Sequence, residues 1–244
     1  MLRLNGYNRD HAPFEVSKYV RESEVATMTA LQSVTNLVAR VHDWGVGTLS
    51  KSNGEHCYSP PISSSKAHAG IDPRCLFIIF DHKRGAPSED LFWEPESDTQ
   101  AARATFIEGY ANYAIQVAEL SYDAIGSLNF GEGSASGSIT VGPLVDLYGI
   151  SGIAPPHFPG PFKTMRDRYI LHIDRVLEYT RKGLVGRGRP LYVYLAHLVA
   201  RSLVMNCADL AKEEGEFFIR QPDALICQFL SHENEITAVL DWEL

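Results

Sequence analysis

Two aspartates frame the part of the sequence that decides the fold, RQPDALICQFL (residues 220–230) followed by ITAVLDWE (residues 236–243). Asp223 stands in a polar stretch after a short apolar segment, and Gln228 follows five positions later. Asp241 ends the second apolar segment, 18 positions after Asp223. The intervening residues 231–235 have the composition of a turn. We therefore predict strand, loop, strand, turn and strand over residues 217–244, a hairpin that brings the two aspartates together.

The spacing of these side chains is that of a phosphoryl-transfer site. Such a transfer needs one Asp that orients the substrate hydroxyl, an amide oxygen on Mg²⁺, and a second Asp on Mg²⁺. The catalytic loop of kinases separates its Asp from its Asn by five positions, as Asp223 is separated from Gln228 here. Taken from spacing alone, two aspartates that only cap a loop and a strand end remain the alternative.

The first third of the chain predicts a small sheet. Apolar spacing predicts a strand over 2–4, a helix over about 15–33, a strand over 37–44 that Gly45 ends, and a buried strand over 75–80. Residues 45–74 are rich in Ser, Gly, Pro and His, and they predict a long surface loop. The polar break at 81–85 marks a boundary, so we expect a reduced N-terminal lobe over 1–82 and a C-terminal lobe over 83–244.

The C-terminal lobe is expected to be mostly helical. Apolar residues at spacings of 4, 3, 4 and 3 predict one helix with a buried stripe, namely Phe106, Tyr110, Tyr113, Val117 and Leu120. Further helices are predicted over about 163–184 and 190–212, and a hairpin over 125–141 around the glycine-rich residues 131–137. The fold class that these elements indicate is α+β, with a small sheet lobe and a larger helical lobe.

Composition excludes several classes of protein. The 244 residues carry 22 Lys and Arg against 30 Asp and Glu, a net charge of −8 that disfavours duplex nucleic acid as a partner. The longest apolar runs have about six residues, whereas a membrane span needs roughly 20, so no membrane partner is expected. Four cysteines stand singly, without a paired spacing, and residues 1–8 lack the apolar stretch that is expected of a secretory signal. These observations favour the cytoplasm.

Four groups of segments carry a family resemblance, in the order in which they occur in the chain. They are residues 24–28 with 41–44, residues 77–85, residues 125–128 with 141–143 and 160–162, and residues 220–223 with 241–243. In this order they resemble the aminoglycoside phosphotransferase family, and within it the fungal branch of small-molecule kinase-like proteins. The resemblance covers most of the chain, and it implies a protein-kinase-like bilobal fold with ATP and Mg²⁺ between the lobes.

The resemblance also implies site residues. Asp223 matches the catalytic Asp that orients the hydroxyl of a small-molecule substrate. Gln228 and Asp241 match the two metal-binding positions. The expected activity is Mg-ATP-dependent phosphoryl transfer to that hydroxyl.

Nucleotide-binding positions follow from the same resemblance. Glu24 matches the helix Glu that pairs with a phosphate-binding Lys, and Arg3 is the nearest candidate for that cation. Asp81 and His82 lie where the family's hinge meets adenine.

Several departures from the family pattern leave other functions open. The residue two positions before Asp223 is Gln221 where the family has His, and Leu225 and Gln228 replace a polar residue and the metal-binding Asn. No glycine-rich phosphate loop precedes Glu24, the strand Lys is missing, and the chain is short at both ends relative to the family, as a shortened gene product would be. The alternatives are a catalytically impaired kinase-fold binding or regulatory protein, and a fold repurposed for other biosynthetic chemistry.

Overall fold

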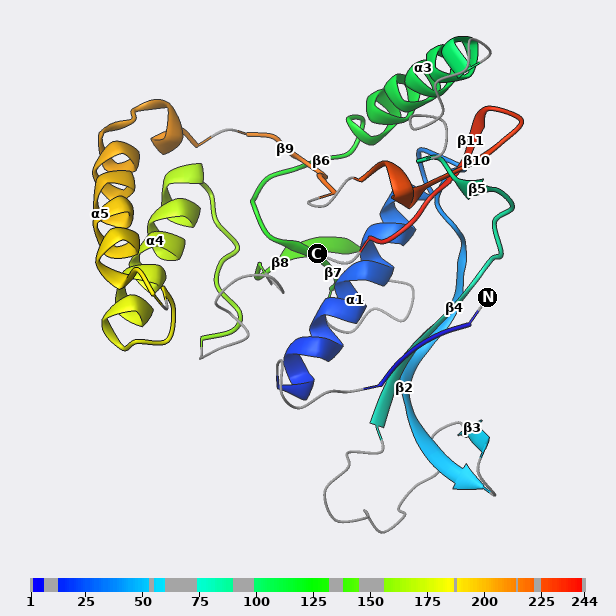
Figure 1. Cartoon of the computed structure of the whole chain (residues 1–244), viewed down its shortest axis with the longest axis horizontal. Coiled ribbons are helices and arrows are strands. Elements are labelled where there is room, and N and C mark those ends of the chain that lie inside the picture. The colour runs from blue at the N-terminus through cyan, green and yellow to red at the C-terminus, as the bar shows by residue number, and fades with distance from the viewer. Residues whose placement is uncertain are drawn as a thin grey trace. The chain divides into compact units, whose positions relative to one another are not determined.

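The structure is a computed structural model (Figure 1). It describes residues 2–6, 13–52, 55–59, 74–89, 99–131, 138–144, 156–186, 188–213, 215–221 and 225–242. The side chains of 2–6, 48–52, 55–59, 74 and 99 are not described. Its contacts group the chain into two compact units. The first consists of residues 1–120, 129–139 and 219–244, and the second of residues 121–128 and 140–218.

A four-stranded antiparallel sheet forms part of the first unit. Its strands are β1 (Leu2–Gly6), β2 (Val41–Ser52), β3 (Glu55–Ser59) and β4 (Arg74–Phe80), in the order β1-β4-β2-β3. The predicted strands over 2–4 and 75–80 are confirmed, and Cys75–Ile78 are buried as expected for a central strand.

The second strand and the loop after it were predicted incorrectly. The strand begins at Val41 instead of residue 37, and it continues through Gly45 to form a hairpin with β3. Gly45 does not end the strand because it is part of the ladder with β4, opposite Phe77, whose ring lies 3.5 Å from where a Cβ would stand. A glycine inside a strand often marks such a close approach. Of the predicted surface loop over 45–74, residues 53, 54 and 60–73 lie outside the described residues.

Helix α1 (Phe14–Leu31) confirms the first predicted helix. Pro13 precedes it and Glu15 lies in its first turn, where a negative charge favours the helix dipole. The helix contacts β2 and β4. Twelve of its 18 residues are buried, so burial covers most of its circumference and not only one stripe.

The core of the first unit lies between α1, helix α3 (Thr99–Val117) and a three-stranded sheet. That sheet has the order β11-β10-β5, with β5 (Ala86–Pro87), β10 (Phe229–His232) and β11 (Glu235–Val239). The predicted hairpin near the C-terminus is therefore confirmed. The predicted stripe of α3 is confirmed at Phe106, Tyr113 and Val117, while Tyr110 is 43% exposed.

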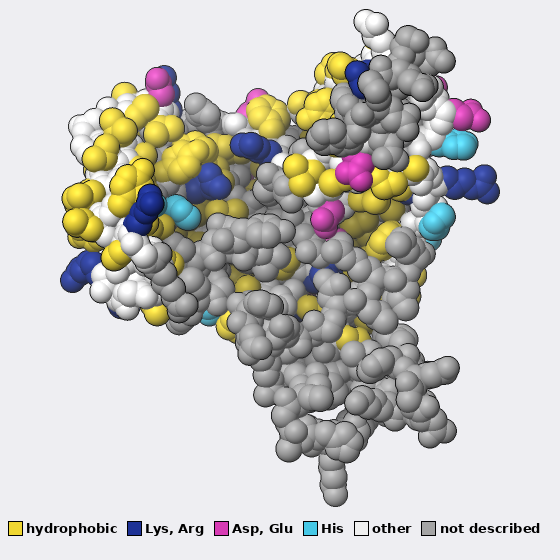
Figure 2. Space-filling view, in the orientation of Figure 1, with side chains coloured by type: hydrophobic (Ala, Val, Ile, Leu, Met, Phe, Trp, Pro, Cys, Tyr) yellow, Lys and Arg dark blue, Asp and Glu magenta, His cyan; other side chains and the backbone are white. Residues whose placement is uncertain are grey.

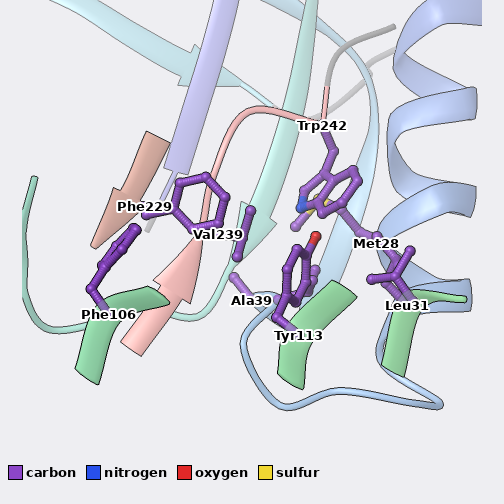
Figure 3. Packing of buried hydrophobic residues seen from close by; sticks show 10 residues of the cluster. Met28, Leu31, Ala39, Phe106, Tyr113, Phe229, Val239 and Trp242 are labelled. Atoms are coloured by element: carbon purple, nitrogen blue, oxygen red, sulfur yellow. The ribbon is translucent and has the colours of Figure 1, made fainter. Parts of the chain in front are cut away.

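Aromatic rings hold this core together (Figure 3). The ring of Phe229 makes edge-to-face contacts with Phe106 at 5.8 Å and with Tyr110 at 5.5 Å between centroids. Such pairs contribute about 0.5–1.5 kcal/mol each beyond the burial of their area. Trp242, which directly follows Asp241, is 2% exposed and lies 6.4 Å from the ring of Tyr113. The core therefore includes the residue next to a predicted metal ligand.

The second unit contains two long helices, α4 (Met165–Arg181) and α5 (Pro190–Asn206), which pack against each other. Thr164 caps α4 by accepting a hydrogen bond from the Asp167 amide at 3.0 Å. The short helix η2 (Asp209–Ala211) follows α5, and β6 (Ser121–Tyr122) pairs with β9 (Phe217–Phe218). Both predicted helices are confirmed with shorter bounds.

The strands β7 (Ser127–Phe130) and β8 (Ile139–Gly142) form the predicted hairpin around the glycine-rich stretch, of which residues 132–137 lie outside the described residues. The α+β class is thus confirmed by helices together with small antiparallel sheets. The division into lobes at residue 82 stays a prediction. Among the described helices, none has the length and apolar character that crossing a membrane requires.

Candidate functional site

The chain returns on itself at the β10–β11 hairpin and then reaches Asp241. Glu233 and Asn234 at the turn have φ values of 52° and 70°, the left-handed pair that a tight two-residue hairpin turn requires. Asp241 is also left-handed, with a φ of 62°. This conformation is uncommon outside glycine, and Asp and Asn tolerate it better than most residues. The exposed Asp241 side chain is therefore presented from an unusual backbone, immediately before the buried Trp242.

Gln221 connects the two sequence segments that were predicted to meet. Its side-chain Nε2 lies 2.8 Å from the main-chain oxygen of Leu240 and 3.0 Å from that of Asp241. The same nitrogen lies 3.0 Å from Oε1 of Gln228. Gln221 and Gln228 are both about nine-tenths buried. One buried amide group thus donates toward three acceptors from the two segments.

Gln228 ends the short helix η3 (Ile226–Gln228), and its side chain faces inward. Its Oε1 accepts from Gln221 and from the main-chain nitrogen of Leu225, the latter at 3.2 Å. Its main-chain oxygen accepts from the Leu240 nitrogen at 2.8 Å. An amide oxygen has two lone pairs, and both have protein donors here. The role of Gln228 as a metal ligand stays a prediction, and it requires this amide to turn.

The predicted hinge, residues 81–85, connects β4 to β5. The main-chain nitrogen of Asp81 donates to the Arg40 oxygen at 2.9 Å, and Oδ1 of Asp81 lies 2.6 Å from Nε2 of His42. This hydrogen bond from His42 lowers the pKa of the Asp81 carboxyl below its ordinary value. His82 is exposed. Because β5 pairs with β10, the segment that contains Asp81 leads directly into the sheet whose last strand ends before Asp241.

Gly85 at the end of this segment shows how closely the chain passes the hairpin. A Cβ at Gly85 would lie 2.7 Å from Oγ1 of Thr237, and the φ of Gly85 is 138°. Thr237 itself donates to the Arg84 oxygen at 2.5 Å. The segment is therefore attached to β11 by contacts that a larger residue at position 85 would disturb.

Glu24 lies inside α1 and is 3% exposed. It forms an ion pair with Arg21, one turn earlier on the same helix and 5% exposed. Removing one partner from a buried pair is expensive because it leaves an uncompensated charge. The C-terminal end of α1 packs into the same core as Trp242, so Glu24 and Asp241 belong to elements that share one core.

Arg3 pairs with Ile78 in the ladder between β1 and β4, and its side chain lies outside what the structure describes. Asp223 also lies outside the described residues. The nearest described residues in the sequence are Gln221 and Leu225, and both donate a hydrogen bond to Oε1 of Gln228. The roles assigned to Arg3 and Asp223 stay predictions.

Reasoning from the sequence missed two residues that organise this region. Gln221 was noted only as a departure from the family's His, and nothing in the polar stretch from Arg220 to Asp223 singles it out from the sequence. His42 was not assigned a role, and only the pairing of β2 with β4 reveals that it lies beside Asp81. Within the described part of the chain, no group of three or more His, Cys, Asp and Glu side chains is arranged to hold a metal ion.

Comparison with protein-family models, with curated proteins and with solved structures found no match for this chain.

Proposed function

We propose that this chain is a kinase-fold protein similar to the aminoglycoside phosphotransferases, which uses Mg-ATP to phosphorylate a hydroxyl of a small molecule. The observation that carries the proposal is the side chain of Gln221, which binds the main-chain oxygen of Asp241 at 3.0 Å. This hydrogen bond joins Gln221, two positions before Asp223, to Asp241. The β10–β11 hairpin, which the resemblance requires, lies between Gln221 and Asp241 in the sequence. Strand β5, which follows the segment that contains Asp81, pairs with β10 of that hairpin.

The residues present fit a magnesium ion that is held mainly by substrate phosphates. Mg²⁺ is usually bound by one or two carboxylates together with phosphate oxygens and water, not by an all-protein cage. The exposed Asp241 offers one carboxylate, and Gln228 could add an oxygen if its amide turned. When bound, Mg²⁺ with ATP supplies charge neutralisation on the transferred phosphoryl group.

Each predicted residue has a physical task in this proposal. Asp223 orients the substrate hydroxyl and receives its proton, because an aspartate within hydrogen-bond reach is the general base that this transfer uses. Asp241 provides negative charge where the cation sits. Gln221 keeps the backbone of Asp241 in place, and positioning to within about 0.5 Å is what such a site requires.

A second candidate is a binding protein that retains nucleotide affinity without transfer. Two observations favour it. The Gln228 oxygen already has two donors, and Glu24 is paired with Arg21 on its own helix. In this arrangement Gln228 would be a weaker ligand for a cation, and Glu24 would be less able to pair with the residue that positions a phosphate.

Thermal unfolding with nucleotides distinguishes these functions. Ligand at 100 times its dissociation constant stabilises the native state by about 2.7 kcal/mol. For a phosphotransferase we expect ATP to raise the melting temperature only with Mg²⁺, and Asp241→Asn to abolish the shift. Asn tolerates the left-handed backbone at this position, so the variant changes charge and leaves the conformation intact. Asp209→Asn, which changes an exposed aspartate of the second unit, should keep the shift.

The outcomes separate the candidates. A magnesium-independent shift that Asp241→Asn leaves intact supports the binding protein. No shift with any nucleotide, with or without Mg²⁺, refutes both. If the magnesium-dependent shift is found, transfer of the labelled γ-phosphate to a panel of polyhydroxylated small molecules, lost in Asp223→Asn, tests the reaction itself.

A further inference from the structure

We propose that α5 mediates association of two copies of this chain. The proposal concerns the second unit alone and is independent of the nucleotide function. Seven apolar side chains of α5 are 41–72% exposed, and we call them the outer face of α5. They are Leu191, Tyr192, Leu195, Leu198, Val199, Leu203 and Met205. Figure 2 shows hydrophobic side chains gathered over this helix.

Helix α5 is apolar around most of its circumference, and Arg201 is its one charged residue besides the titratable His197. Arg201 is turned toward α4, where it donates to Asp174 at 2.6 Å. Nδ1 of His197 lies 2.7 Å from the main-chain oxygen of Val193 on α5 itself. None of the 17 residues of α5 is buried. A surface helix ordinarily turns its apolar stripe inward and its charged residues outward, so the outer face is built to be covered.

The area of the outer face matches what a stable dimer needs. Seven exposed apolar side chains of roughly 100 Å² each give on the order of 700 Å², close to the ~800 Å² that each partner contributes to a standard protein–protein interface. The helix is about 25 Å long, which is sufficient for one helix to lie along another. Contiguous apolar patches of this size on a soluble protein mark interaction sites.

A second copy is the occupant that the charges favour. No charged residue lies among the side chains of the outer face. The polar residues between them are Ser202 and Asn206, and the Asn206 side-chain amide donates to the main-chain oxygen of Ser202 at 2.7 Å. A chain of net charge −8 repels its own copies, and an uncharged face is where that repulsion is smallest. A two-fold axis requires a patch that is complementary to itself. An antiparallel pair of α5 helices meets this condition and also sets opposite helix-dipole ends together.

The experiment is sedimentation velocity on the full chain between about 1 and 100 µM, with Leu195→Glu, Leu203→Glu and Ile115→Glu. Ile115, on α3, is 65% exposed and serves as the matched control because it lies outside the outer face. Because both copies in a two-fold dimer contain the substitution, each variant places two negative charges in the interface. We expect wild type and Ile115→Glu to form dimers, and each α5 variant to raise the dimer dissociation constant at least tenfold.

Circular dichroism shows whether the variants fold. The altered side chains are exposed in one copy, so unchanged helicity is expected. A wild-type chain that is monomeric over the whole concentration range overturns the proposal, as does a dimer that both α5 variants leave intact. A photo-crosslinking residue at Tyr192 checks the geometry, since it should give a dimer band in wild type and none in Leu195→Glu.

Discussion

Replacing Gln221 by Leu is the most informative change to this protein. Leu has a similar volume and no polar atoms, so the variant removes the amide and disturbs packing little. Nε2 of Gln221 faces three acceptors at 2.8–3.0 Å, the side-chain oxygen of Gln228 and the main-chain oxygens of Leu240 and Asp241. The amide has two N–H groups, so one of them serves a single acceptor and the other is shared between the remaining two.

The cost follows from this geometry. A net hydrogen bond contributes about 1 kcal/mol, and a buried acceptor left without a donor costs about 1–3 kcal/mol. Loss of two bonds, with the acceptors still partly buried, gives an expected destabilisation of about 2–4 kcal/mol. Gln32→Leu is the matched control, because Nε2 of Gln32 donates to a single oxygen, that of Ala39, at 2.6 Å. We expect about 1 kcal/mol there.

Urea unfolding followed by tryptophan fluorescence measures both variants. Trp242, one of three tryptophans in the chain, is buried in the core of the same unit and adjoins the network, so its contribution to the emission changes in the relevant transition. The free energy of unfolding is obtained from the midpoint and slope. The reasoning is refuted if Gln221→Leu unfolds at the wild-type urea concentration, or if it is destabilised no more than Gln32→Leu.

Four further predictions concern Tyr113, Gly126 and the pair of His42 with Asp81. The hydroxyl of Tyr113 is buried without a hydrogen-bond partner, so Tyr113→Phe should leave the urea midpoint unchanged or raise it, and a loss above about 1 kcal/mol would contradict this. Burial raises the pKa of the Tyr113 hydroxyl, so the contribution of the protonated hydroxyl to stability is present below about pH 10 and is lost as the pH rises further. Above about pH 10, the urea midpoint of the wild type should therefore fall more steeply than that of Tyr113→Phe. Gly126→Ala should lower stability by about 1–3 kcal/mol, because its Cβ would lie 2.0 Å from a carbonyl oxygen of β8, whereas Gly215→Ala, with open space around it, should be near neutral in the same thermal scan. The hydrogen bond from His42 lowers the pKa of the Asp81 carboxyl, so the contribution of this carboxylate to stability is present above its ordinary pKa and is lost as the pH falls through the lowered pKa. In an NMR titration, His42→Ala should return the pKa of Asp81 to its ordinary range. An unchanged pKa in this variant would reject the pairing.

Strongly periodic or uniformly apolar segments were predictable from the sequence. The buried strand over 75–80, the helix around Phe106 and Tyr113, and the hairpin after Phe229 all follow from local patterns. The strand over Val41–Ser52 was misplaced because its second half is mostly polar and the strand contains two glycines, Gly45 and Gly47, so that only pairing with β4 and β3 makes it a strand. Tertiary context overrides weak local preference in such cases.

The sequence predicted which residues lie near the candidate site, but it did not predict the contacts between them. The spacing of Gln228 and Asp241 placed them on opposite sides of a hairpin, and the structure brings their backbones together through Leu240. The sequence alone could not show that Gln221 binds both segments, since that bond depends on the register of the hairpin. Nor could it show that the Gln228 oxygen is filled by protein donors, because one of them is the main-chain nitrogen of Leu225, set by the turn of η3.

The left-handed pair at Glu233 and Asn234 has a consequence for inherited changes of length. A two-residue turn sets which residues of β10 and β11 lie opposite each other, and a shift of one position turns every side chain of a strand to the other face. A codon gained or lost at this bend would shift β11 by one position against β10 and turn Val239, which packs in the core, to the other face of the sheet. Among descendants of this gene, insertions at the bend should therefore be rare, and substitutions there should favour Asn, Asp and Gly, which tolerate the left-handed conformation.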